Sequence, residues 1–272
     1  MLSSEPGRRT AIVTGAASGL GRALAVRLAR DGWTIALADI NAAGSEETKE
    51  LVDAAGGEGF FEPLDITRID QWQALHDRLR GRWEHLDLLV NNAGVGGSGE
   101  VGQFSLDAWR RLLEVNLFGG IQGCHTMINW LKANPRRSHL INTASFAAMA
   151  SAPSMAAYNV AKAGMFALSE TLYAELRPHG VGVTVICPLF FRTNLLSNWP
   201  CTTDAERRAA EFYTENAGFS AADVADAAVR AMQRGRLYVV LGRKARWYWR
   251  MKRLMPQTFL NMIARRYATW LK

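Results

Sequence analysis

Short apolar runs alternate with helical stretches along almost the whole chain, and this alternation restricts the possible folds more than any other feature. The run Thr10–Thr14 is short and rich in β-branched residues, and Trp33–Ala38 and Leu86–Val90 are mostly apolar, as are strands that are buried on both faces. A stretch with helical periodicity, Leu20–Asp31, follows the first of them. Strands that alternate with helices form a parallel sheet covered on both faces. The sequence therefore predicts one doubly wound α/β domain.

The rest of the chain continues this pattern. Ser105 is predicted to cap a long helix that ends near Leu131, and Ser220 with Asp223 has capping-box spacing. The other predicted helices are Ala42–Ala55, Ile69–Arg82 and the one that carries Tyr158, and the other predicted strands are Gly59–Leu64, His139–Thr143, Val181–Ile186 and Leu237–Leu241.

Composition narrows the class of protein. With 272 residues, 49% of them hydrophobic, the chain is long enough to bury a substantial core. We expect no secretory signal and no membrane-spanning helix, because no apolar run approaches about 18 residues. The three cysteines are scattered (Cys124, Cys187, Cys201), which argues for the reducing cytoplasm and against disulfides or a metal site.

The net charge of +7 is unevenly distributed. Arg230–Lys272 contains 12 basic residues and no acid, whereas the preceding residues carry 20 basic and 25 acidic ones. The basic character thus belongs to the C-terminal tail, and it does not indicate a protein that binds nucleic acid as a whole.

A glycine-rich loop directly follows the first predicted strand. Its sequence, Thr-Gly-Ala-Ala-Ser-Gly-Leu-Gly, gives the candidate cofactor-binding residues Gly15, Ser18, Gly19, Leu20 and Gly21. Glycines at such a turn let the backbone approach a pyrophosphate, which then sits on the helix N-terminus. Close strand–helix packing is the alternative use of glycines there.

Asp39 ends the second strand and bears on the choice of cofactor. A carboxylate there accepts hydrogen bonds from ribose hydroxyls and repels a 2′-phosphate. No Lys or Arg occupies 16–18 or the position of Ile40, so NAD is favoured over NADP. The alternative role for Asp39 is to cap the next helix. Asp65 and the segment Asn91–Gly94 end the next two strands at the same sheet edge.

Tyr158 and Lys162 are four residues apart in an Ala-rich run, so both side chains lie on one helical face. We expect the ammonium to lower the pKa of the phenol, so that the pair can exchange a proton near neutrality. Ser145, at the end of a predicted strand, is placed to hold a substrate oxygen. A chance pair of helix neighbours is the alternative reading of this spacing.

Taken together, the glycine loop, the strand-three Asp, the Asn-Asn-Ala-Gly segment, the serine and the Tyr-x-x-x-Lys resemble the classical short-chain dehydrogenase/reductase family from about Arg9 to Gly242. This resemblance implies a Rossmann-like domain that moves hydride between a nicotinamide cofactor and an alcohol or ketone. It also implies homo-oligomerisation, as a dimer or tetramer.

By this resemblance, Tyr158 is the general acid/base, Lys162 also holds the nicotinamide ribose, Ser145 orients the substrate oxygen and Asn116 helps to hold a relay water. The remaining implied cofactor contacts are Asp65 and Ile66 at the adenine, Asn92, Ala93 and Gly94 at the adenosine ribose, and Pro188 and Thr193 at the carboxamide. Leu189 stands where the family commonly has Gly.

Residues 189–220 are expected to form a lid over the substrate. Phe190, Phe191, Leu195, Leu196 and Trp199 lie close together in it, which suits a hydrophobic alcohol or ketone. Packing of the lid onto the domain explains the same residues equally well.

We divide the chain into a catalytic domain, 1–242, and a basic aromatic extension, 243–272. From Phe259 onward the extension has one broad apolar face. Three alternatives remain for it: packing on its own domain or a second subunit, peripheral contact with a membrane, and, least favoured, nucleic-acid binding.

The sequence thus predicts a cytoplasmic, NAD-preferring dehydrogenase that interconverts a hydrophobic secondary alcohol and its ketone. The alternatives are an NADPH-dependent ketone reductase and a non-catalytic cofactor-binding regulator or membrane-associated scaffold.

Overall fold

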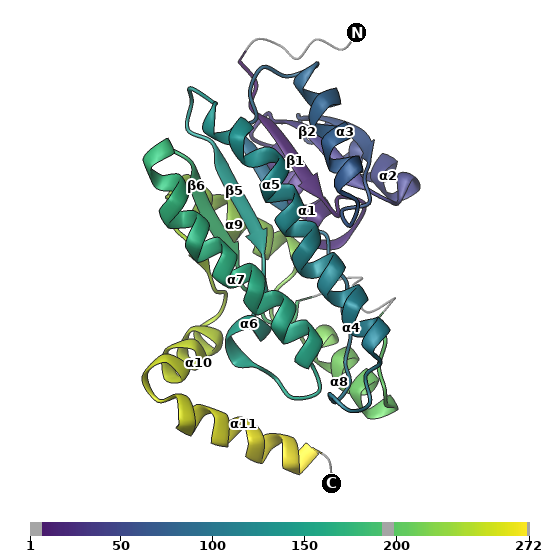
Figure 1. Ribbon diagram of the computed structural model, residues 1–272, viewed down its shortest axis with the longest axis vertical. Helices are drawn as coiled ribbons and strands as arrows, with labels where there is room; N and C mark the ends of the chain where they lie inside the picture. The colour runs from purple at the N-terminus through teal and green to yellow at the C-terminus, as the bar shows by residue number, and fades with distance from the viewer. Residues whose placement is uncertain (1–6, 192–198, 271–272) are drawn as a thin grey trace.

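A computed structural model of the chain describes residues 7–191 and 199–270. Its centre is a parallel sheet with the strand order β3-β2-β1-β4-β5-β6-β7 (Figure 1). The strands are β1 Thr10–Thr14, β2 Thr34–Asp39, β3 Glu58–Pro63, β4 Leu88–Asn91, β5 His139–Thr143, β6 Gly182–Ile186 and β7 Tyr238–Val239. The order reverses between β1 and β4, and ligands bind open α/β sheets beyond the carboxyl ends of the strands at such a point.

Helices cover both faces of this sheet, as the continuous apolar strands predicted. Their bounds are α1 Gly19–Ala29, α2 Ala42–Ala54, α3 Ile69–Arg80, α4 Leu106–Leu113, α5 Gly119–Lys132, α6 Ala147–Ala150, α7 Ala156–Leu176, α8 Asp204–Glu215, α9 Ala221–Gln233, α10 Arg243–Leu254 and α11 Pro256–Trp270, with a short 3-10 helix at Arg177–His179. Ser105 and Ser220 cap α4 and α9 as the sequence predicted.

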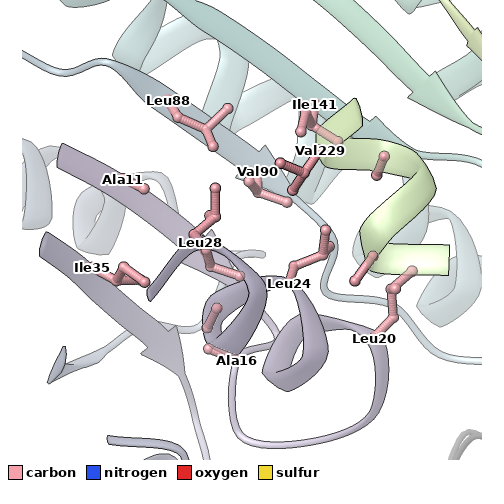
Figure 2. Close-up of a cluster of buried hydrophobic side chains, with 14 of the residues drawn as sticks. Ala11, Ala16, Leu20, Leu24, Leu28, Ile35, Leu88, Val90, Ile141 and Val229 are labelled. Atoms are coloured by element: carbon pink, nitrogen blue, oxygen red, sulfur yellow. The ribbon is translucent and has the colours of Figure 1, made fainter. Parts of the chain in front are cut away.

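Two apolar layers fix the helices to the sheet. On one face, Leu24 and Leu28 of α1 and Val229 of α9 pack on Ala11, Val90 and their strand neighbours (Figure 2). On the other face, α3, α5 and α7 pack against the alternate side chains of the same strands, with Trp72 at the centre. Because successive strand residues point to opposite faces and helices cover both, every residue of β1 and β4 is buried.

The helix predicted from Ser105 to about Leu131 is interrupted. A π-helical segment, Glu114–Phe118, joins α4 to α5. Such π turns are frequent at functional sites, and this one contains Asn116. Hydrophobic periodicity over the whole stretch gives no indication of the extra residue in the turn.

The extension forms two helices, α10 and α11, which meet at Met255 and Pro256 and lie beyond α6 at the end of the molecule farthest from the N-terminus (Figure 1). We call this pair the C-terminal hairpin. Its Phe259 is 1% exposed and packs in one cluster with Phe146 and Met149, next to Tyr248. The hairpin therefore packs on its own domain through part of the apolar face that the sequence predicted.

Candidate active site

The glycine loop follows β1 and approaches the end of β4 closely. Gly15 has φ +67, and a Cβ added to it would lie 2.8 Å from the Cα of Ala93. A Cβ on Gly21 would collide with the Gly15 carbonyl. The N-cap of α1, Ser18, makes no side-chain cap hydrogen bond, so the first amides of α1 stay available. A glycine cradle ahead of such a helix N-terminus fits a phosphate group.

Asp39 stands at the end of β2 beside this loop. Its carboxylate accepts hydrogen bonds from the amides of Ala17 at 3.0 Å and of Asn41 at 2.9 Å. Asn41, rather than Asp39, caps α2. The adjacent Ile40 is 73% exposed, which leaves the outer side of this edge open to a ligand.

Arg22 directly follows the glycine loop, and its guanidinium is already engaged. It donates to the carbonyl of Ala17 at 2.6 Å and pairs with Glu47 at 2.8 Å, while Nε donates to Thr48 at 2.9 Å. These contacts tie Arg22 of α1 to the glycine loop and to α2.

Thr14 joins the ends of β1 and β4. Its hydroxyl accepts from the amides of Asn92 at 2.9 Å and Ala93 at 3.1 Å. The Asn92 amide group donates to the Thr14 carbonyl at 3.0 Å and accepts from Thr143 of β5 at 3.3 Å. The predicted segment Asn92–Gly94, which follows β4, is thus fixed against the ends of the two neighbouring strands, β1 and β5.

The three residues predicted to carry the chemistry meet at the next strand end. Ser145 follows β5, and its hydroxyl accepts from the amide of Ala147 at 3.1 Å. Tyr158 lies in the first turn of α7 and Lys162 one turn later, and both are buried. The Lys162 ammonium donates to the Thr143 carbonyl at 3.0 Å and lies 5.8 Å from the centre of the Tyr158 ring.

The pKa of Tyr158 is raised, not lowered as the sequence predicted. Burial raises the pKa of Tyr158 to about 12, and the Ser145 side chain acts in the opposite direction. Burial also lowers the pKa of Lys162 to about 8. Helical spacing correctly predicted that the two groups are neighbours, but desolvation is the largest cause of the pKa shift of each.

Asn116 projects from the π turn toward the end of β4. Its side-chain carbonyl accepts from the Val95 amide at 3.2 Å, and its Nδ2 donates to the Val95 carbonyl at 2.7 Å. A Cβ on Gly94 would lie 2.5 Å from Asn116 Oδ1 and 3.4 Å from Lys162 Nζ. A small cavity is lined by Asn116, Lys162 and Thr143 among others. The π turn therefore brings Asn116 to the same cavity as Lys162.

The remaining predicted positions lie around the same edge. Asp65 accepts from Thr67 through its amide and hydroxyl, and Ile66 is buried. The Pro188 carbonyl accepts from the Phe146 amide at 2.8 Å, which ties the end of β6 to the Ser145 turn. Thr193, Leu195 and Leu196 lie outside the described residues.

Trp199 covers Tyr158, a contact that the sequence did not predict. The two rings are 5.7 Å apart, and the indole Nε1 donates to Ser98 at 2.7 Å. The indole lies directly against Gly96, where a Cβ would collide with it. The other apolar groups near Ser145 are Phe146 and Met149, each 6% exposed.

Part of the C-terminal hairpin remains outside the core. Leu254 is 80% exposed, Trp247 55% and Met255 52%. In the part of the chain that the structure covers, no helix combines the length and apolarity needed to cross a bilayer. Over the same residues, no cluster of three or more His, Cys, Asp or Glu side chains is arranged to hold a metal ion.

Comparison with known proteins agrees with this arrangement. The model of the short chain dehydrogenase family matches residues 9–203. The probable oxidoreductase EphD of Mycobacterium tuberculosis is 36% identical over 185 residues, which cover 68% of this chain and 31% of EphD. This chain thus spans about a third of that relative. A 3beta-hydroxysteroid dehydrogenase of Mediterraneibacter gnavus is 31% identical over 201 residues, covering 74% of this chain and 71% of the relative.

A solved structure gives the same result for the fold. The short-chain dehydrogenase/reductase of Burkholderia phymatum in complex with NAD has a TM-score of 0.85 at 30% identity, covering 90% of this chain and 93% of the other. Structural neighbours have been solved with NAD or with NADPH. The chain belongs to the short-chain dehydrogenase/reductase family, whose members are oxidoreductases that use nicotinamide cofactors.

Proposed function

We propose that the protein is an NAD-preferring dehydrogenase that interconverts a hydrophobic secondary alcohol and its ketone. The observation that carries this proposal is the meeting of Ser145, Tyr158 and Lys162 in one buried site at the carboxyl edge of the sheet. A nicotinamide bound at this edge would supply the hydride chemistry. The residues of this chain would supply the proton and the orientation of the substrate.

In this proposal Tyr158 exchanges a proton with the alcohol oxygen, which Ser145 holds by a hydrogen bond. Lys162 holds the nicotinamide ribose. Its positive charge also stabilises the phenolate that forms when Tyr158 gives up its proton. Asn116 keeps the backbone at Val95 in place and lines the cavity that would hold a relay water.

The glycine cradle, with Gly15, Ser18, Gly19, Leu20 and Gly21, would hold the pyrophosphate. Asp39 and Ile40 would bind the adenosine end of the cofactor. The other proposed cofactor contacts are Asp65, Ile66, Asn92, Ala93, Gly94, Pro188 and Thr193.

Asp39 supports NAD as the preferred cofactor. Two backbone amides hold its carboxylate at the edge where the adenosine ribose would bind, and a 2′-phosphate there would be repelled. Arg22, which could offset this repulsion, is bound to Glu47 and to backbone carbonyls.

The apolar walls support a hydrophobic substrate. Trp199 covers Tyr158 at 5.7 Å between ring centres, and Phe190 stacks on Tyr213 at 5.3 Å. The relative that acts on a 3β-hydroxysteroid is also consistent with an apolar secondary alcohol.

Titration of the purified protein with NADH and NADPH, followed by nicotinamide fluorescence, tests the proposal first. Tighter binding of NADH supports it and directs the search to apolar alcohols with NAD. Tighter binding of NADPH favours the alternative, an NADPH-dependent ketone reductase. Binding of neither nucleotide overturns both and favours the non-catalytic scaffold.

Tyr158→Phe then separates an enzyme from a cofactor-binding regulator. For the enzyme, turnover falls by about 10²–10⁴-fold, the usual contribution of a general acid/base, while nucleotide affinity is unchanged. If Tyr158→Phe retains the activity of the wild type, the proposed role of the phenol is wrong.

The proposal also includes two interactions of the protein, one with further copies of itself and one with a membrane surface. Exposed apolar side chains on α4, on the π turn and on α7 (Leu106, Phe118, Val160) suit a homo-oligomer, which light scattering of the purified protein tests. Peripheral membrane contact through the C-terminal hairpin is supported by its exposed Trp247 and Leu254 next to six cations in Arg243–Arg253. Unchanged liposome partitioning after truncation at Gly242 overturns this contact.

A further inference from the structure

The loop 151–155, which leads into the catalytic helix α7, contains an unusual backbone conformation at both Ser151 and Ser154. Ser151 has φ 54 and Ser154 has φ 56, and within residues 7–191 and 199–270 they are the two non-glycine residues with positive φ. The left-handed region is unfavourable for a residue with a β-carbon. Such conformations persist where the surroundings hold them, and they cluster at functional sites.

The C-terminal hairpin holds both serines. The Lys252 ammonium of α10 donates to the Ser151 hydroxyl at 3.0 Å, and Tyr267 of α11 hydrogen-bonds the Ser154 hydroxyl at 2.7 Å. Tyr267 also donates its proton to Glu100 at 2.6 Å. The Ser154 hydroxyl is therefore the donor to Tyr267, and the chain of bonds runs from Ser154 through Tyr267 to Glu100.

The same loop connects to both sides of the catalytic cleft. The Ser154 carbonyl accepts from the Gly99 amide at 2.6 Å, next to Ser98, which holds Trp199. Asn159, the neighbour of Tyr158, donates from its side chain to the Ala152 carbonyl at 2.7 Å. A change in the loop would thus reach Tyr158 from one side and the Trp199 wall from the other.

We propose that Tyr267 is a positioning residue of the active site, with Lys252 as a second anchor. Together they clamp the loop 151–155 in its left-handed conformation and so fix Tyr158 relative to Ser145. The C-terminal hairpin, which lies outside the matched family segment 9–203, would then be a working part of the catalytic domain. This proposal rests on the proposed function for its kinetic consequence, but the clamp itself does not.

Tyr267→Phe tests the clamp because it removes one oxygen and keeps the ring. Tyr248→Phe is the matched control: its hydroxyl accepts from Arg266 at 2.7 Å, entirely within the hairpin, and its ring packs beside Phe259. A purely structural role for the hairpin predicts that the two variants behave alike.

The first measurement is amide hydrogen exchange in the free protein, which needs no turnover. In Tyr267→Phe we expect the amides of Gly99, Ser151, Ala152, Ser154 and Met155 to exchange about tenfold faster, because local opening becomes easier. Tyr248→Phe should exchange at the rate of the wild type. Equal exchange in Tyr267→Phe and the wild type overturns the clamp, as does equal acceleration in Tyr248→Phe.

The second measurement is the division of the effect between kcat and KM. Tyr267→Phe should lower kcat about tenfold and leave the KM for nucleotide unchanged, because small misplacement of reacting groups is costly while the cofactor contacts stay intact. Ser154→Ala should also lower kcat, and the double variant should be no worse than Tyr267→Phe, since both changes break the bond between Ser154 and Tyr267. Fully additive losses overturn the proposed pairing.

Ser154→Gly distinguishes the effect of the strained backbone at residue 154 from the effect of losing the hydrogen bond to Tyr267. Glycine adopts positive φ freely, so Ser154→Gly should retain a higher kcat than Ser154→Ala although both lack the hydroxyl. A lower kcat in Ser154→Gly contradicts the clamp. If the wild type itself shows no turnover with either nucleotide, the proposed function fails, and the exchange rates alone then decide whether the clamp exists.

Discussion

The indole of Trp199 lies 5.7 Å from the phenol ring of Tyr158, with the two planes tilted by 41°. This contact helps to bury the phenol, and burial is the main cause of its raised pKa. The proposed wall of the substrate site and the proposed proton donor are therefore not independent. In this proposal, the side chain that limits which substrates fit also changes the acidity of the group that would react with them.

Trp199→Ala should lower the apparent pKa of Tyr158 by about one unit, because the phenolate becomes better solvated. The measurement is the pH dependence of kcat/KM for alcohol oxidation. Trp199→Phe is the control, since it keeps an aromatic ring over Tyr158 and loses only the bond to Ser98. An unchanged pH profile in Trp199→Ala would show that the indole does not affect the phenol.

Asp39→Asn should shift the cofactor preference toward NADPH by about tenfold or more. The variant removes the repulsion between the carboxylate and the 2′-phosphate of NADPH, and about 1.4 kcal/mol of repulsion corresponds to a tenfold change in affinity. The amide keeps the size of the side chain. The ratio of the dissociation constants for NADH and NADPH measures the shift. Asp107→Asn, at an exposed carboxylate paired with Arg110, should leave this ratio unchanged.

Lys162→Met should abolish turnover and yet stabilise the free protein at pH 7. Burial lowers the pKa of Lys162 to about 8, so the unfolded chain binds more protons at this residue between pH 8 and 10.5. Stability due to Lys162 therefore rises with pH across this window, and below it the buried charge costs up to about 3 kcal/mol. Urea unfolding at pH 7 measures the gain. A loss of stability in Lys162→Met, while Lys132→Met is neutral, contradicts the argument.

His139 should make the fold sensitive to acid. Its ring is buried, hydrogen-bonds Thr184 at 2.9 Å, and has a pKa lowered to about 4 by burial. Thr184 donates its own proton to the Arg236 carbonyl, so His139 Nε2 carries the hydrogen. As pH falls from 6.5 to 4 the unfolded chain takes up the proton first, and up to about 3 kcal/mol is lost. Unfolding of His139→Gln should depend less steeply on pH over this range.

The local parts of the site could be predicted from the sequence. Four-residue spacing places Tyr158 and Lys162 on one helical face, and strand ends place Asp39 and Ser145 at one edge, because both depend on the regular periods of helix and strand. The fold class follows in the same way from the alternation of apolar runs and helical stretches. These expectations are confirmed in the bounds of the central strands and of α1 to α3.

Contacts between distant segments could not be predicted. Trp199 and Ser98 are 101 residues apart, and Ser154 and Tyr267 are 113 apart, so no local pattern indicates either pair. The predicted direction of the pKa shift of Tyr158 was wrong for a related reason, since desolvation depends on every side chain packed around the ring. No sequence pattern indicated α10 as a separate helix, although Pro256 explains why α10 ends before it.

The π turn at Glu114–Phe118 determines the direction in which the side chains of α5 project, relative to those of α4. One residue of an α-helix corresponds to about 100° of rotation, so deleting a single residue in the turn would rotate α5 by about that angle relative to α4. The side of α5 on which a Cβ would meet Ile66, Met165 and Trp72 is made of Gly119, Gly120 and Gly123. Rotation would replace these glycines with larger side chains at the tightest contacts of the helix. A one-residue deletion that straightens this helix would therefore damage the core as well as the site, so the length of this segment should tolerate less change than its composition.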